Sequence, residues 1–333
     1  MKRIVALCLL LCAGVFSVFA GGSGESAGSS GSVAAFPAGK PITLICPWAP
    51  GGGSDIGARM VVPYMEKKLG TTINVINPTG ASGWVGWERM LAAPADGYSF
   101  AMINLPTIYP GYLDPSLGRS KTIDDFQMLA NHVTESCVIA IRADETRFTD
   151  LASFIKYAKA NPVTMATTGV GTDDHILLQL FNAAVGTSIT MVPGNGFKDS
   201  YTALLGKHVD AAAANVGEVL VPEKNKELKT IVVFSENTSR LMPHVPVWNK
   251  LGLGGSIVIS SQRAFACKKG TPPEIVKILA DALQDAIGNQ EQVAKMAEMG
   301  LDVDYMGPED FAKHAKNEEG KIKGMADVMG WKK

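Results

Sequence analysis

The sequence predicts an α/β fold made of two lobes joined by crossing strands. Apolar runs of strand length alternate with helical patterns along the 333 residues, which is typical of α/β proteins with mostly parallel sheets. A unit of strand, glycine-rich turn and helix occurs at residues 41–59 and recurs at residues 163–184. The length also suggests two domains of ordinary size.

The first unit begins with a short apolar strand. Ile42, Leu44 and Ile45 supply the strand, and Pro47 and Pro50 end it. The three glycines that follow let the backbone turn sharply and leave its amides uncovered.

A helix follows the glycine turn. We expect Ser54 or Asp55 to cap it and its core face to consist of Ile56, Met60 and Tyr64. The first N–H groups of a helix have no intrahelical partner, so this turn predicts an anion site, with a βα turn that binds no ligand as the alternative.

The same patterns place the remaining elements. Strands are predicted at residues 73–77, 98–103, 126–133, 136–141, 163–166, 190–192, 209–213, 229–234 and 303–305. Helices are predicted through residues 84–90, at 176–184, at 274–287 and at 290–299. Three more are predicted from the cap at 149–150 to residue 160, from after Phe197 to residue 205, and from residue 308 onward. Thr271 and Glu274 have the spacing of a capping box, and the apolar run 256–267 is expected to pass between the lobes.

Ligands of such sheets bind outside the carboxyl ends of the strands. The glycine turns at residues 51–53, 80–83 and 169–171 each follow a predicted strand. We therefore expect these turns to face one cleft.

The composition excludes several classes of protein. With 46% hydrophobic and 19% charged residues, the chain can bury a sizeable core. A formal net charge of −1 with interspersed signs disfavours nucleic-acid binding. The distant spacing of Cys46, Cys137 and Cys267 predicts no metal site. Buried free thiols are expected, with a disulfide between Cys137 and Cys267 as the alternative.

Residues 1–20 have the pattern of a signal peptide. Lys2 and Arg3 precede an apolar run, and a small-residue cleavage site ends at Ala20. The run is short for a membrane span, so we expect cleavage and a periplasmic or other extracytoplasmic location. Cys12 follows a poor lipobox, which leaves a lipid anchor as the alternative. The Gly- and Ser-rich start of residues 21–38 predicts a flexible linker.

Seven short segments carry recognisable motifs. They are P-W-A-P-G-G-G-S-D at 47–55, N-P-T-G-A-S-G at 77–83, A-P-A-D-G-Y at 93–98, G-V-G-T-D-D-H at 169–175, L-L-G-K-H-V-D at 204–210, P-H-V-P-V at 243–247 and G-T-P-P-E-I-V at 270–276. In this order they resemble the substrate-binding proteins of tripartite tricarboxylate transporters, the Bug family, over about residues 40–325.

The resemblance implies a fold like that of periplasmic binding proteins, with the ligand cleft between the lobes. We place the first lobe at residues 39–139 and 265–333 and the second at 140–264. The implied function is to close over a small carboxylate and to deliver it to integral-membrane transporter subunits. The resemblance implies a binding protein rather than an enzyme, and we expect a monomer without cofactor or metal.

The family's ligands include di- and tricarboxylates, acidic amino acids and aromatic acids. Gly194 and Asn195 stand where the family usually has Tyr and Lys. This departure leaves the identity of the acid open.

The candidate ligand contacts lie on the glycine turns and at the strand ends. In the first lobe they are Trp48, Ala49, Gly52, Gly53, Ser54, Asp55, Gly80, Ala81, Ser82, Gly83, Asn104 and Thr107. In the second lobe they are Thr168, Gly169, Val170, Gly171, Thr172, His175, Asn195 and Asn215.

The sequence also supports three expectations about the chemistry of the site. No Lys, Arg or His lies in residues 47–54 or 79–87, so backbone amides and helix dipoles are expected to supply the positive potential. We interpret the Asp55 carboxylate as a cap that points away from the ligand. His175 is either a ligand contact or a structural residue that holds the loop at Gly169.

Three other functions remain open. A hydrolytic enzyme would use Ser54, Asp55 and His175, although no G-x-S-x-G motif is present. A nucleotide-binding protein would use the glycine loops, although they lack the Lys-Ser/Thr of a P-loop and the third glycine of G-x-G-x-x-G. A surface lipoprotein with an adhesive or structural role would bind no small molecule.

Overall fold

The computed structural model describes residues 36–331 of the chain. The expected signal peptide, Cys12 and residues 21–35 of the expected linker lie outside this range. Phe36 and Pro37 fall within the range assigned to the linker, yet both are buried. The rings of Phe36 and Tyr98 are 4.9 Å apart, and the Tyr98 hydroxyl donates a hydrogen bond to the Pro37 carbonyl. The folded region therefore includes Phe36.

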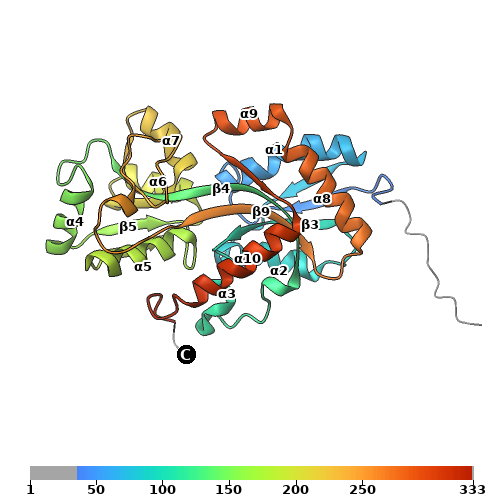
Figure 1. Ribbon diagram of the computed structural model, residues 1–333, viewed down its shortest axis with the longest axis horizontal. Helices are drawn as coiled ribbons and strands as arrows, with labels where there is room; N and C mark the ends of the chain where they lie inside the picture. Colours follow the sequence, from blue (N-terminus) through green and yellow to red (C-terminus); the bar gives the residue numbers. More distant parts are fainter. Residues whose placement is uncertain (1–35, 332–333) are drawn as a thin grey trace, which may run out of the picture. The chain divides into compact units, whose positions relative to one another are not determined.

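Strands and helices alternate along most of the described chain (Figure 1), which confirms the expected α/β class. The strands are β1 (Ile42–Ile45), β2 (Ile73–Ile76), β3 (Ser99–Leu105), β4 (Phe126–Arg142), β5 (Thr164–Thr167), β6 (Thr190–Pro193), β7 (Ala211–Asn215), β8 (Leu228–Val233), β9 (Ser260–Lys268) and β10 (Val303–Met306). The α-helices are α1 (Gly53–Leu69), α2 (Trp84–Ala92), α3 (Pro110–Leu113), α4 (Leu151–Ala160), α5 (Asp173–Val185), α6 (Phe197–Leu205), α7 (Val216–Lys224), α8 (Pro273–Ile287), α9 (Gln290–Glu298) and α10 (Pro308–Lys323).

Two sets of parallel strands form the centres of two lobes. In one set β1 lies between β2 and β3, and in the other β5 lies between β6 and β7. We call the part built on β1, β2 and β3 the first lobe and the part built on β5, β6 and β7 the second lobe. The glycine turns follow β1, β2 and β5, as the sequence predicts.

The long strands β4 and β9 connect the two lobes (Figure 1). β4 pairs with β9 up to Ser136 and with β7 and β8 from Cys137 onward, so one strand belongs to both sheets. The expectation of two strands, at 126–133 and 136–141, is wrong because Thr134 and Glu135 stay extended and pair with β9. The apolar run at 256–267 contributes β9, which lies between the lobes as expected.

The sheets are mixed rather than mostly parallel. β9 runs antiparallel to β3, and β4 runs antiparallel to β7, β8, β9 and β10. Alternating strands and helices predict the parallel pairs correctly. They do not reveal strands that cross back between lobes, and these strands form the antiparallel pairs.

Helices cover both faces of the first lobe. α1 and α8 share a core with β1 on one face, and α2 packs on the other. The residues of α1 that join the hydrophobic core are Ala58, Val61 and Met65 rather than the expected Ile56, Met60 and Tyr64, which are half-buried. Both sets of residues have helical spacing. The side of α1 that carries the small residues Gly57 and Ala58 packs against the sheet.

Two helix starts differ from the expectations. α8 begins at Pro273, and the Thr271 hydroxyl donates to the Lys268 carbonyl, so the expected capping box with Glu274 is wrong. α7 was not predicted from the pattern, because Gly217 and Pro222 interrupt its helical signal.

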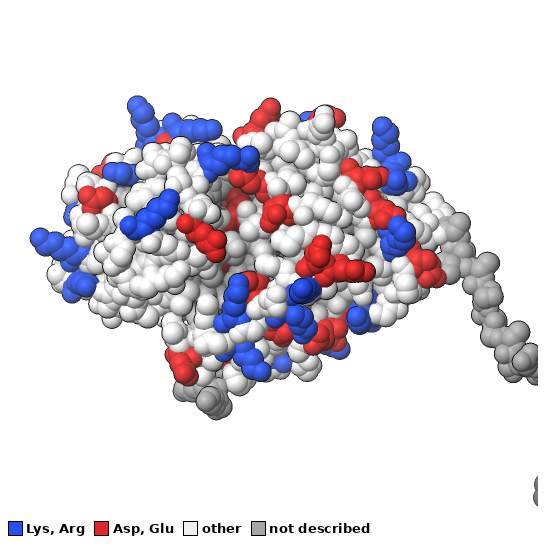
Figure 2. Space-filling model, in the orientation of Figure 1, with Lys and Arg blue, Asp and Glu red and all other residues white. Residues whose placement is uncertain are grey.

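The cysteines and the surface agree with the composition. Cys46, Cys137 and Cys267 are free and buried, so the expected free thiols are confirmed over the alternative disulfide. Within residues 36–331, no helix is both long enough and apolar enough to cross a membrane. Basic and acidic side chains are interspersed over the face shown in Figure 2.

Candidate functional site

The N-terminus of α1 keeps its first amides open. Gly51 turns the chain with a φ of 82°, and α1 begins at Gly53 with Gly52 as its N-cap. No side chain caps the helix, so the expectation that Ser54 or Asp55 does so is wrong. Within the described range, the amides of Gly53 and Ser54 have no acceptor. These amides and the helix dipole create a position for an anion.

Asp55 points away from this position. Its carboxylate accepts hydrogen bonds from Gly51 N at 2.9 Å, Arg59 Nε at 3.0 Å and Asn77 Nδ2 at 2.9 Å. Burial opposes the charge, but these bonds outweigh it and hold the pKa of the Asp55 carboxyl below its usual range. Asp55 therefore fixes the turn before α1, which agrees with its interpretation as a group that points away from a ligand.

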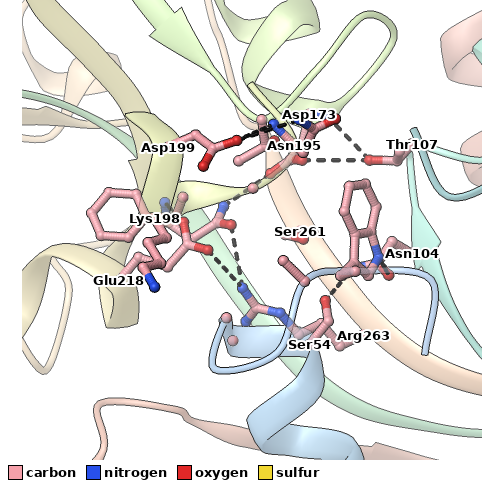
Figure 3. Close-up of a pocket in the computed structure, with 18 of the residues that line it drawn as sticks. Ser54, Asn104, Thr107, Asp173, Asn195, Lys198, Asp199, Glu218, Ser261 and Arg263 are labelled. Atoms are coloured by element: carbon pink, nitrogen blue, oxygen red, sulfur yellow. Dashed lines mark hydrogen bonds and ion pairs between the residues drawn. The ribbon is translucent and has the colours of Figure 1, made fainter. Parts of the chain in front are cut away.

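A cavity opens at the α1 N-terminus, between the lobes (Figure 3). We call it the first cavity. The predicted contacts that line it are Trp48, Ala49, Gly52, Gly53, Ser54, Asn104 and Thr107 of the first lobe and Thr168, Asn195 and Asn215 of the second. Its volume of about 80 Å³ is well below the roughly 300–1,000 Å³ of sites for drug-sized molecules, so it suits a compact ligand.

Hydrogen bonds fix the first-lobe wall of this cavity. Trp48 Nε1 donates to Asn104 Oδ1 at 2.6 Å, and Asn104 Nδ2 donates to Ser54 Oγ at 3.1 Å. Because Ser54 Oγ accepts in this bond, its own hydrogen is free to donate to a ligand.

Arg263 of β9 brings a buried positive charge to the first cavity, and sequence reasoning missed it. A Cβ on Gly53 would lie 2.7 Å from Arg263 Nη2, so the guanidinium sits against the start of α1. The guanidinium pairs with Glu135 of β4 and lies 3.6 Å from Glu218 Oε1 and 3.4 Å from Asn215 Oδ1.

Arg263 keeps its charge at neutral pH. Burial lowers the pKa of Arg263 to about 10, which is still well above 7. The expectation that backbone amides and helix dipoles alone supply the positive potential is therefore wrong.

Two acids that were not predicted as contacts also line the first cavity. Asp173 accepts hydrogen bonds from Asn215 Nδ2 at 2.9 Å and from Cys137 Sγ at 3.3 Å, and Glu218 accepts one from Asn215 N at 3.0 Å. Burial raises the pKa of the Asp173 carboxyl above its usual range and that of Glu218 to about 8.

Cys137, Asp173 and Asp174 place three groups that can bind metals within 4.8 Å of one another. The hydrogen bond from Cys137 to Asp173 requires the thiol proton. Burial raises the pKa of Cys137 well above its usual value. The arrangement therefore fits a protonated thiol in a hydrogen-bonded cluster rather than a thiolate ligand.

The glycine turns at 80–83 and 169–170 meet beside a second cavity. Ser82 Oγ donates to the Val170 carbonyl at 2.6 Å, which joins the two lobes directly. The predicted contacts that line this second cavity and not the first are Gly80, Ala81, Ser82, Gly83, Gly169 and Val170. Trp48, Thr168 and Asn195 line both cavities. The single expected cleft is thus divided into two adjoining cavities.

Gly171, Thr172 and His175 line neither cavity. Thr172 caps α5 by accepting a hydrogen bond from His175 N at 3.4 Å, and His175 Nδ1 accepts one from Gly171 N at 3.0 Å. Burial lowers the pKa of His175, which keeps Nδ1 available as an acceptor. Of the two interpretations of His175, this geometry fits the structural one.

The residues of the hydrolase alternative are not assembled. Ser54 contacts Asn104, whereas the ring nitrogens of His175 contact Gly171 and Gln179. A nucleophile needs its base within hydrogen-bonding distance, and this condition is not met.

Comparisons with known proteins identify the family of this chain. The family model described as tripartite tricarboxylate transporter family receptor, TctC, matches residues 57–330. BugT of Bordetella pertussis is 29% identical over 269 residues, which cover 80% of this chain and 81% of BugT.

Solved structures show the same fold. A TctC solute-binding protein from Polaromonas, solved without ligand, is 26% identical with a TM-score of 0.66 over 88% of this chain and 99% of that one. The periplasmic binding protein BugD is 23% identical with a TM-score of 0.80 over 88% of this chain and 98% of that one. These matches confirm the expected two-lobe fold of periplasmic binding proteins.

The family consists of solute-binding receptors rather than enzymes. Its model matches most of the chain, from Gly57 to Gly330. This chain therefore belongs to the TctC family of tripartite tricarboxylate transporter receptors, to which the Bug proteins are related.

Proposed function

We propose that this protein is an extracytoplasmic receptor that captures a small carboxylate between its lobes and delivers it to a tripartite tricarboxylate-type membrane transporter. The observation that carries the proposal is the convergence of the open α1 amides and the Arg263 guanidinium in the first cavity. The helix N-terminus supplies about half a positive charge, and the guanidinium, which is paired with Glu135, adds N–H donors beside it. Each charge-assisted hydrogen bond to a carboxylate there would contribute about 1.5–3 kcal/mol.

Two ligand-bound structures of the same fold support this class of ligand. MatC from Rhodopseudomonas palustris was solved with malate, and another R. palustris protein was solved with adipate. They are 23% and 22% identical to this chain, so they favour a carboxylate without naming the acid.

Lobe closure is part of the proposal. Residues 39–139 and 265–333 would form one lobe and residues 140–264 the other, with β4 and β9 as the connecting strands. Closure would exclude water and strengthen the hydrogen bonds to the carboxylate, and the contact between Ser82 and Val170 would hold the closed state.

Delivery to a transporter also rests on the N-terminal segment and the family. A signal peptide at residues 1–20 would export the protein, with Cys12 as the point of attachment if the chain is lipid-anchored. We propose that the monomer then meets the integral-membrane subunits of the transporter.

A thermal-shift screen tests the proposal. The protein is first unfolded and refolded to remove ligand carried through purification. It is then heated with di- and tricarboxylates, amino acids and aromatic acids, and separately with NAD and ATP. At least one carboxylate should stabilise the protein, by about 2.7 kcal/mol at 100 times its Kd, and the nucleotides should not.

Variants test whether the stabilisation by carboxylate arises in the first cavity. Ser54→Ala and Arg263→Met should reduce the stabilisation by ligand, whereas Ser188→Ala, at an exposed position, should leave it unchanged. The absence of stabilisation by any carboxylate would contradict the proposed function.

A further inference from the structure

The walls of the first cavity hold more acidic than basic groups. Arg263 pairs with Glu135, and together these two side chains carry no net charge when both are ionised. Asp173 and Glu218 remain as two further acids that line the same cavity. The exposed Lys198 and Asp199 add one charge of each sign at its edge and leave the balance unchanged.

Both extra acids have oxygens with unused acceptor capacity. Glu218 Oε2 accepts from Asn215 N, but Glu218 Oε1 lies 3.6 Å from Arg263 Nη2, too far for a hydrogen bond. Within residues 36–331, no other donor binds Glu218 Oε1. Asp173 Oδ1 accepts only a long bond of 3.4 Å from the Thr107 hydroxyl within that range.

Arg263 is also incompletely paired. Its side chain is 2% exposed, yet Nε has no hydrogen-bond partner within the described residues. Buried donors are normally satisfied, so the unpaired Nε is available to an acceptor bound in the cavity that Arg263 lines. The cavity therefore has an open donor beside α1 and open acceptors on Asp173 and Glu218.

We propose that the ligand is an aminocarboxylate, whose carboxylate binds Arg263 and the α1 amides and whose ammonium group binds Asp173 and Glu218. This inference rests on the proposed function and narrows its substrate class. An ammonium group offers three donors and a positive charge to the weakly bonded oxygens of Asp173 and Glu218. A di- or tricarboxylate without an amino group would bring no donor to these oxygens and further acceptors instead.

The pKa values of Asp173 and Glu218 in the protein without ligand are consistent with an ammonium subsite. Burial raises the pKa of Glu218 to about 8 and that of Asp173 above its usual range. Because they are buried, these acids hold protons more tightly than acids in water do. An ammonium group would compensate their charge and favour the ionised forms.

Binding measurements on matched acids test the inference. Protein freed of ligand is titrated calorimetrically at pH 7 with the twenty amino acids, 4-aminobutyrate, succinate, malate, glutarate, citrate and benzoate. For the tightest aminocarboxylate, the analogues with hydrogen or hydroxyl in place of the ammonium group are then titrated. The aminocarboxylate should bind about 10–100-fold more tightly than both analogues, the equivalent of one charge-assisted hydrogen bond.

The outcomes separate the two proposals. Binding of a carboxylate that lacks an ammonium group, as tightly as the best aminocarboxylate, would overturn this inference and leave the proposed function standing. The absence of binding by acids of every class would overturn both.

Isosteric variants test the two acids directly. Glu218→Gln and Asp173→Asn should each weaken binding of the aminocarboxylate at least about 10-fold and should not weaken binding of its analogue without nitrogen. Glu274→Gln, at an exposed position on α8, is the matched control and should change neither. Arg263→Met should weaken both ligands. If aminocarboxylate binding is unchanged in both acid variants, the proposed ammonium subsite is wrong. If one variant fails to fold, the comparison of the aminocarboxylate with its analogues still tests whether the ammonium group contributes to binding.

Discussion

Arg263 of β9 and Glu135 of β4 form a buried ion pair between the two strands that connect the lobes. Both side chains are only 2% exposed, and Glu135 Oε1 also accepts a hydrogen bond from Gly217 N at 2.8 Å. The pair holds the guanidinium against the α1 N-terminus. The ion pair should therefore affect the stability of the fold, and the guanidinium should separately affect ligand binding, so variants can distinguish the two effects.

Arg263→Met should leave Glu135 buried without its cation and lower the free energy of unfolding by about 3–5 kcal/mol. Adding Glu135→Gln should recover most of this loss, because the second change removes the uncompensated charge while keeping an acceptor for Gly217. Urea unfolding at pH 7 of the single and double variants measures both effects. Carboxylate binding should be lost in both. A double variant as unstable as Arg263→Met alone would contradict the ion-pair account.

Gly53 is the point of closest approach between α1 and Arg263. In Gly53→Ala the new Cβ would lie 2.7 Å from Nη2 and 2.8 Å from Cζ of Arg263, so the guanidinium must move. We expect a loss of about 1–3 kcal/mol in the free energy of unfolding, together with weaker carboxylate binding.

Gly52→Ala is the matched control for stability. Its Cβ would meet only the Ala49 carbonyl, at 3.5 Å, and the φ of Gly52 is −79°, which alanine adopts freely. Chemical denaturation should show a change of less than about 1 kcal/mol. Equal losses in Gly52→Ala and Gly53→Ala would show that the approach of Arg263 is not the cause.

Ser82→Ala removes the hydrogen bond to Val170 that joins the two lobes. Because Ser82 is partly exposed, the free energy of unfolding should change by less than about 1 kcal/mol. Ligand dissociation should be faster by about 3–10-fold, because the loss of one hydrogen bond weakens the closed state. Stopped-flow fluorescence measures the rate, with the exposed Ser188→Ala as control. An unchanged dissociation rate would argue against a role of this contact in closure.

The Glu218 carboxyl predicts a pH dependence of stability. Burial raises its pKa to about 8 from an ordinary value of 4.5, so the folded protein binds a proton more tightly than the unfolded chain does. The resulting stabilisation is fully present below about pH 4.5 and is lost as the pH rises through about 8.

Glu218→Gln isolates this effect because glutamine does not titrate. Between pH 4.5 and about 8, the wild type should lose up to about 1.4 kcal/mol per pH unit relative to the variant. Urea unfolding of both proteins without ligand, at several pH values in this window, measures the difference. A difference that stays constant with pH would contradict the raised pKa.

The local parts of the site could be predicted from the sequence. The strand, glycine turn and helix at residues 41–69 depend on signals close together in the chain. Asn104, Thr168 and Asn215 line the first cavity as predicted, because each lies at or just beyond the carboxyl end of a strand.

The charged groups could not be placed in the same way. Arg263, Glu135 and Glu218 lie on β9, β4 and α7, and their meeting depends on how these distant segments cross. A partial signal was present in the sequence. Arg263 stands within the apolar run at 256–267 that was expected to pass between the lobes, where a charge is rarely tolerated without a partner.

The division of the cleft also depends on tertiary contact. Ser82 has a positive φ of 51° and reaches Val170 of the other lobe, so the loops touch and two cavities result. Glycine spacing predicts the turns themselves. It carries no information on how closely two turns from different lobes approach each other.

The structure of the protein with the tightest-binding acid from the screen tests the central claim most directly. The account predicts that a ligand carboxylate oxygen lies within about 3.2 Å of the Gly53 or Ser54 amide nitrogen and of the Arg263 guanidinium. A ligand bound in the second cavity, or one whose carboxylate lies away from the α1 N-terminus, would contradict it.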